Sequence, residues 1–314
     1  MKKLFQSSTC SWVFACLFFG TNAEAQHSAP LLADDPILTT GLQLSSAAFV
    51  KGQLYSVEEK FHRLLIIDPI SMRVVREDPG FSEKIDKEAE IEAIAVYKNN
   101  RLLMTDEAHA SILEYDITSN KLSPVKVNGI DISSDKGEMG IEGIAIEGDS
   151  ICYLLKERDD QYRSQIRVFN IKVRNGKTEL DYTGTNLLVQ HSEQPGTDVE
   201  HRWRYSDLYF DGGNLYAMRS LFAEKGKDPC KYIIDAINVG TYRGRQNYLI
   251  DDSDLVYWDI SPKINHYRNT HSTNLEGLAF RNNKIYTVSD NVKGESDPEY
   301  SGYDKTMIIA LQKP

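Results

Sequence analysis

A short motif recurs five times along this chain, and each copy opens an apolar run that is followed, after a polar turn, by a second apolar run. The five copies begin at Ser45, Glu92, Glu142, Ser206 and Glu276. The second runs begin at Leu54, Leu102, Cys152, Leu215 and Ile285. Runs of this length, bounded by turns rich in Gly, Asn or Lys, predict short antiparallel strands. A repeat at such intervals is typical of a β-propeller, so we expect an all-β fold with five blades.

The ends of the chain indicate how the ring of blades closes. Third strands are legible in every repeat, but the chain stops after the third strand of the last one. The lead at residues 26–41, around Pro36-Ile37-Leu38, is therefore predicted to supply the missing strand and to remove two exposed sheet edges. Residues 42–314 are then a single propeller domain. Long insertions near 186–204 and 242–273 leave six blades as an alternative, because the second contains the strand-like run Leu255-Val256-Tyr257-Trp258.

The first 25 residues are predicted to be a secretory signal peptide and not part of the fold. Lys2 and Lys3 precede an apolar core from Cys10 to Gly20, which is too short to span a bilayer, and Ala23-Glu24-Ala25 is a small-x-small cleavage site. We therefore expect a periplasmic or secreted protein. No later segment predicts stable membrane insertion.

Charge and cysteine content restrict the partners. The formal net charge is −10, which argues against nucleic acid. The expected partner is a small anionic ligand or a protein, and the chain is expected to be a monomer. After removal of the signal, Cys152 and Cys230 remain. They either form one disulfide or stay as two buried thiols.

The first position of the motif is predicted to form a metal site. Because the first strand of each blade lines the central channel of a propeller, equivalent residues meet near the axis. The set is Ser45, Glu92, Glu142, Ser206 and Glu276. Three converging carboxylates repel one another unless some are protonated or a cation lies among them. An oxygen-only donor set suits calcium. The alternative is that these side chains cap the starts of neighbouring strands.

A second ring is expected 14 residues further along each repeat. These positions are Glu59, Asp106, Lys156, Ser220 and Asp290. Together with Glu107, Arg204 and Arg219 they are candidates for a ligand-binding mouth, with Lys156, Arg204 and Arg219 as an anion clamp. The alternative is a solvated rim of charges between blades.

These motifs resemble three families. The segments from Glu90 to Ala95 and from Gly140 to Ala145, with the strands that follow them, resemble the SdiA-regulated family of exported bacterial propellers. The Ser-Glu-Glu-Ser-Glu order is similar to that of the calcium-activated nucleotidases. That resemblance implies five blades and central calcium on Ser45, Glu92, Glu142, Ser206 and Glu276. The stretch from His201 to Tyr205 departs from the nucleotidase pattern. A looser similarity joins the last repeat to the esterase-like phytase family.

Two functions from different classes follow. In the first, the protein is an exported calcium-binding propeller that binds a ligand or partner at its central mouth. In the second, it is a calcium-dependent hydrolase of phosphoanhydrides or phosphate esters. There, Lys156 and Arg219 would offset phosphate charge, and Asp106 or Glu107 would orient water. The sequence leaves both open, because metal-assisted hydrolysis needs no side-chain nucleophile.

Overall fold

The computed structural model describes most of the chain from Ile37 onward. The described ranges are 37–40, 42–59, 61–137, 140–191, 203–221, 231–242, 244, 246–265, 274–290 and 305–313. The predicted signal peptide, the lead before Ile37, and Cys230 lie outside these residues. Within them, no helix is long and apolar enough to cross a membrane.

The described strands form three four-stranded antiparallel sheets and one nine-stranded sheet. The nine-stranded sheet contains two four-stranded antiparallel segments joined at their outer strands, and we call these segments the second and third sheets. The first contains β2 (Leu44–Val50), β3 (Gln53–Glu58), β4 (Arg63–Asp68) and β5 (Arg73–Asp78). The second contains β6 (Ile91–Tyr97), β7 (Arg101–Asp106), β8 (Ser111–Asp116) and β9 (Lys121–Asn128). The third contains β10 (Ile141–Glu147), β11 (Ile151–Lys156), β12 (Ser164–Arg174) and β13 (Lys177–Gln190). The fourth contains β14 (Arg204–Asp211), β15 (Asn214–Leu221), β16 (Lys231–Asn238) and β18 (Val256–Asp259).

The fifth sheet joins the two ends of the propeller. It contains β19 (Asn274–Arg281), β20 (Lys284–Asp290), β21 (Lys305–Gln312) and the N-terminal strand β1 (Ile37–Thr40). β1 pairs antiparallel with β21, and Ile37 lies opposite Ile308. The N-terminal segment thus supplies the fourth strand that the last repeat lacks, as the sequence predicts.

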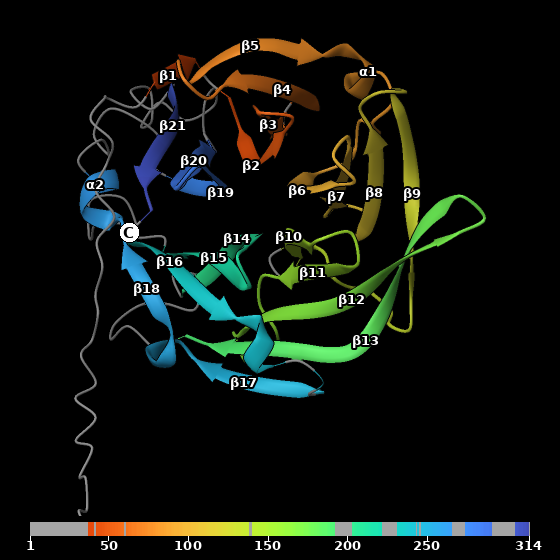
Figure 1. The fold of residues 1–314 in the computed structure, drawn as a ribbon, viewed down its shortest axis with the longest axis vertical. Coiled ribbons are helices and arrows are strands. Elements are labelled where there is room, and N and C mark those ends of the chain that lie inside the picture. The colour runs from red at the N-terminus through yellow and green to blue at the C-terminus, as the bar shows by residue number, and fades with distance from the viewer. Residues whose placement is uncertain are drawn as a thin grey trace, which may run out of the picture.

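The sheets surround a central axis, which Figure 1 shows nearly end-on. The innermost strands β2, β6, β10, β14 and β19 contact one another in cyclic order, including β19 with β2. The β-propeller fold predicted from the repeat is therefore confirmed. Short helices α1 (Pro79–Ser82), α2 (Ser261–Asn265), η3 (Val239–Thr241) and η4 (Asp252–Asp254) lie in the connections.

The second long insertion extends existing sheets. Its strand β17 (Asn247–Asp251) pairs in parallel with β13, and β18 pairs with β16. The run Leu255-Val256-Tyr257-Trp258, which left a sixth blade open, therefore contributes the outer strand of the fourth sheet. β13 also pairs with β9, which joins the second and third sheets at their outer edges.

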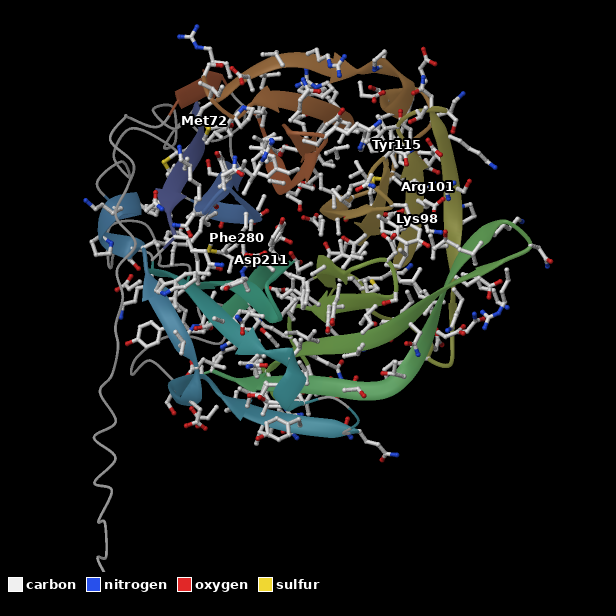
Figure 2. The ribbon with its side chains drawn as sticks, in the orientation of Figure 1. Met72, Lys98, Arg101, Tyr115, Asp211 and Phe280 are labelled. Carbon is white, nitrogen blue, oxygen red and sulfur yellow. The ribbon has the colours of Figure 1, made fainter. Side chains whose placement is uncertain are left out.

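Apolar side chains fill the space between each pair of neighbouring sheets. One cluster links the first and fifth sheets through residues such as Leu54 and Val288, so packing as well as strand pairing closes the ring. Phe280, labelled in Figure 2, lies between the fourth and fifth sheets. Its ring stacks on those of Tyr209 and Tyr216, with centroids 5.1 and 4.5 Å away. A tyrosine that recurs in four of the second strands is also buried in this core. These residues are Tyr55, Tyr153, Tyr216 and Tyr286.

Cys152 is a buried free thiol in this core, on the inner part of the third sheet. Burial raises the pKa of its thiol well above the usual range. The predicted alternative, a disulfide with Cys230, concerns a residue outside the described part of the chain.

Candidate axial cation site

Each inner strand carries a β-bulge at the predicted axial position. In the first sheet, Leu44 lies opposite Glu58 and Ser46 opposite Val57, so Ser45 has no partner in the ladder. The other four inner strands skip one residue in the same way. The bulged residues are Ser45, Glu92, Glu142, Ser206 and Glu276, which we call the inner ring. A bulge changes the direction of one side chain relative to the regular alternation of side chains along a strand. The backbone geometry therefore distinguishes these five positions from their neighbours.

The second ring is displaced by one residue from the predicted one in two blades. The turns after β6 and β10 contain three residues, whereas those after β2, β14 and β19 contain two. Counting 14 residues from the motif start therefore reaches a different register position in the second and third sheets. In each sheet, the residue before the bulge pairs with a residue near the end of the second strand, and the equivalent position is the next residue along the chain. These positions are Glu59, Glu107, Glu157, Ser220 and Asp290.

This correction changes the chemistry of the second ring, which we call the outer ring. Asp106 and Lys156 leave it, and Glu107 and Glu157 take their places. The mixed ring of charges expected from the sequence thus becomes predominantly acidic. The side chain of Asp290 lies outside the described part of the structure.

The carboxylates of the two rings share one electrostatic environment. Burial raises the pKa of Glu92 well above its usual range, and Glu142, Glu59, Glu276 and Glu107 raise it further. Burial and nearby carboxylates also raise the pKa of Glu142, and burial raises those of Glu276 and Glu107 to about 7. The inner-ring glutamates are partly exposed. Protein nevertheless surrounds them closely enough that the loss of hydration is the largest cause of the rise in their pKa values. Such carboxylates favour either a bound proton or a bound cation.

Arg204 is a cation placed inside this acidic cluster. It lies on β14, two residues before Ser206, and its Nη1 is 2.6 Å from Oε1 of Glu157. Its Nη2 is 3.9 Å from Oε1 of Glu276. The guanidinium charge also opposes the rise in the pKa values of Glu142 and Glu276. Arg204, a candidate for binding an anionic ligand, thus contacts carboxylates of the protein.

The other predicted ligand-binding residues also have partners within the protein. Lys156 Nζ donates to Oδ1 of Asp135 at 2.8 Å. Arg219 is 5% exposed and forms ion pairs with Asp235 and Asp252.

Asp106 is also engaged within the fold. Its Oδ2 is 2.8 Å from Nδ1 of His109, and its Oδ1 accepts from the backbone N–H of Glu90 at 3.3 Å. The structure therefore brings Glu59 and Glu107 to the axial cluster, while Lys156, Arg219 and Asp106 brace the surrounding blades.

Several polar atoms at this end of the channel suit a cation. Within the described part of the chain, Ser45 Oγ, Ser220 Oγ and Glu107 Oε1 are buried without a hydrogen-bond partner. Gly140 provides the space for Glu107, since a Cβ at Gly140 would overlap the Glu107 carboxylate. Among the described residues, no three His, Cys, Asp or Glu side chains are already arranged as a metal site. The donor set fits a hard cation, which would have to draw the carboxylates together.

Directly beneath the inner ring, the channel is filled by a buried carboxylate that the sequence reasoning missed. Asp207 Oδ2 accepts from the Leu278 backbone N–H at 2.8 Å and from Ser46 Oγ at 3.3 Å, and its Oδ1 accepts from Leu208 N–H at 2.7 Å. Ser46 Oγ accepts in turn from Ile94 N–H at 3.1 Å. We call this set of bonds, which joins four sheets, the axial brace.

A sequence signal for the brace exists. The positions that follow the inner ring are Ser46, Ala93, Gly143, Asp207 and Gly277, so one Asp stands among small residues. Beyond the brace, the far end of the channel holds a cavity of about 90 Å³ lined by mainly apolar residues such as Phe49, Ile144 and Leu208. The Asp207 bonds therefore lie between the acidic residues and this cavity.

Comparison with solved structures supports the fold. The chain is similar to the glutaminyl cyclase of Myxococcus xanthus, with a TM-score of 0.53 and 11% identity over 91% of this chain and 97% of that chain. It is also similar to regucalcin, a calcium-binding protein from Agrobacterium tumefaciens, with a TM-score of 0.46 and 9% identity over 92% of this chain and 97% of that chain. No family model and no curated protein matches the chain. The likeness to the glutaminyl cyclase supports the fold alone, and the resemblance to the SdiA-regulated family stays a prediction.

Proposed function

We propose that this protein is an exported β-propeller that binds calcium in the acidic end of its central channel and uses that end to bind a ligand or partner. The observation that carries the proposal is the double ring of carboxylates. The charges of Glu92, Glu142 and Glu276 interact with those of Glu59, Glu107 and Glu157. In the described structure, the Arg204 guanidinium contacts Glu157 and Glu276 of this cluster. The exported location rests on the sequence of residues 1–25.

Calcium fits the donors better than a softer metal does. The cluster offers carboxylate and hydroxyl oxygens, and calcium accepts six to eight such ligands in flexible geometry. Glu92, Glu142 and Glu276 would hold the ion, with Ser45 Oγ and Glu107 Oε1 as the buried acceptors that lack partners. A bound divalent ion would supply the positive charge that keeps these carboxylates ionised.

The binding function is favoured over the hydrolase because of where the cations lie. A phosphate-ester hydrolase would need free positive charge beside the metal to offset the substrate. Lys156 and Arg219 were the candidates, and both are paired with aspartates of the fold. Neither side chain is therefore free to offset the charge of a bound phosphate.

The test is calorimetry and thermal unfolding of the chain beginning at Gln26, stripped with chelator and then titrated with calcium or magnesium. We expect calcium binding near one ion per chain and a higher melting temperature, because a ligand that binds only the folded state stabilises it. Glu142→Gln should weaken binding about tenfold or more. The control is Glu83→Gln, an exposed carboxylate beside the peripheral helix α1. An absence of both binding heat and thermal shift would overturn the proposal.

A further inference from the structure

The position of Arg204 is unusual among its equivalents. The residue two places before each inner-ring position lies beside the outer ring, and these residues are Gln43, Glu90, Gly140, Arg204 and Asn274. The other four are neutral or acidic. A basic residue in this set places a positive charge against the acidic cluster from one side of the ring.

The guanidinium of Arg204 is held loosely for a partly buried arginine. Among the described residues, its one short contact is with Glu157, and the contact with Glu276 is 3.9 Å long. Its Nε, like that of Arg219, has no hydrogen-bond partner within this part of the chain. Arginine presents five N–H donors, so this one makes few of the bonds available to it. Its side chain keeps 24% of its surface exposed, which leaves room for it to move toward the channel opening.

Arg219, on the neighbouring strand β15, shows what a fixed arginine looks like in the same sheet. Its Nη2 donates to Asp235 at 3.1 Å, its Nη1 contacts Asp252, and its guanidinium lies 5.1 Å from the centre of the Trp203 ring. Its side chain is 6% exposed. Arg219 is bonded from several directions, whereas Arg204 is held almost entirely by the charge of the cluster.

We propose that Arg204 is a tethered counter-ion that occupies the cation site when no metal is bound, and that a divalent cation enters by displacing it from Glu157 and Glu276. The inference rests on the proposed function and assigns a regulatory role to one residue of that site. Arg204 holds the carboxylates together in the metal-free protein. It also lowers the affinity for metal, because the incoming ion must separate an existing ion pair and face a like charge.

This role makes two predictions of opposite sign. Arg204→Gln removes the positive charge and should therefore tighten calcium binding about tenfold. Substitution of a residue that binds the metal would instead weaken calcium binding. Arg204→Gln should also lower the melting temperature of the chelator-treated protein. Arg204→Lys keeps the charge and should change the affinity by no more than about threefold. Equal or weaker calcium binding by Arg204→Gln would overturn the proposal.

A second measurement tests the counter-ion without metal. In chelator, millimolar methylguanidinium should raise the melting temperature of Arg204→Ala, because it replaces the deleted group in the vacated site. Wild-type protein and the control Arg76→Ala, an exposed arginine on the outer strand β5, should not respond. A response in Arg204→Ala without calcium binding by any variant would support the counter-ion and reject the calcium proposal. No response in Arg204→Ala would overturn the counter-ion.

Discussion

The inner ring and the axial brace are consecutive layers of one channel, and each contains buried carboxylates with opposite surroundings. Asp207 in the brace accepts bonds from two backbone N–H groups and one hydroxyl. Glu92 in the inner ring is surrounded by four other carboxylates that raise its pKa. Asp207 on β14 and Glu92 on β6 occupy positions one residue apart in the repeat, yet the first carboxylate has hydrogen-bond donors of its own and the second faces other carboxylates.

The contrast explains how a propeller combines stability and a binding site on one axis. Buried carboxylates with hydrogen-bond donors on several elements fix the geometry of those elements. Carboxylates that face one another store repulsion, which a bound cation relieves. The brace therefore fixes the strands that carry the inner-ring residues.

The largest effect is expected from removal of the brace carboxylate. Asp207→Ala leaves the buried N–H groups of Leu208 and Leu278 without acceptors and breaks the link to Ser46. Unsatisfied buried groups of this kind cost about 1–3 kcal/mol each, so we expect a loss of about 3–5 kcal/mol in the free energy of unfolding. Denaturant unfolding in chelator measures it. Asp207→Asn, which keeps one oxygen, should lose less than half as much, and equal stability of Asp207→Ala and wild type would show that the brace is not structural.

Much of this contrast could be predicted from the sequence, and the failures have physical causes. The repeat predicts the inner strands and the five inner-ring positions, because strand length and turn residues are local properties. The outer ring was misplaced in two blades because the turns at Lys98–Asn100 and Gly148–Ser150 are one residue longer. The pairing of Arg204 with Glu157 depends on how the third and fourth sheets pack against each other. The local sequence pattern of either sheet does not specify this packing. The Asp207 brace was missed for the same reason.

A smaller effect should follow from overfilling the brace layer at Gly277. A Cβ there would lie 3.0 Å from the backbone nitrogen of Ala47 and from the carbonyl carbon of Ser46, and would overlap a methyl group of Val288. Because backbone atoms of the neighbouring sheet cannot easily move, Gly277→Ala should destabilise the protein by about 1–3 kcal/mol. Denaturant unfolding measures the change. Wild-type stability in Gly277→Ala would mean that the sheets approach each other less closely than the structure shows.

The same substitution at Gly140 should act on binding and much less on stability. The Cβ of Gly140→Ala would meet the end of the Glu107 side chain, which can rotate away, instead of backbone. We expect calcium affinity to fall about tenfold, since a donor oxygen is displaced, while stability in chelator changes by less than about 1 kcal/mol. Calorimetry and unfolding on Gly140→Ala and Gly277→Ala together give a matched pair. An equal loss of stability in Gly140→Ala and Gly277→Ala would contradict the proposed difference between the metal-binding layer and the brace layer.

The smallest effect concerns repulsion in the inner ring of the metal-free protein. Glu92→Gln removes a group whose ionised form burial and the other carboxylates disfavour, so in chelator at pH 7 it should raise stability by about 0.5–1 kcal/mol, whereas Glu83→Gln should change nothing. The pH dependence has a fixed sign. The pKa values of Glu276 and Glu107 are raised to about 7 in the folded state, so the folded protein holds protons that the unfolded chain releases above about pH 4.5. This part of the metal-free stability is therefore full below that pH and is lost as the pH rises toward 7. Glu92→Gln should flatten this dependence, and saturating calcium should oppose it by binding the ionised carboxylates. If stability in chelator instead increased from pH 5 to 7 and Glu92→Gln were neutral, the glutamates would be well solvated and the reason to expect a cation at the axis would be gone.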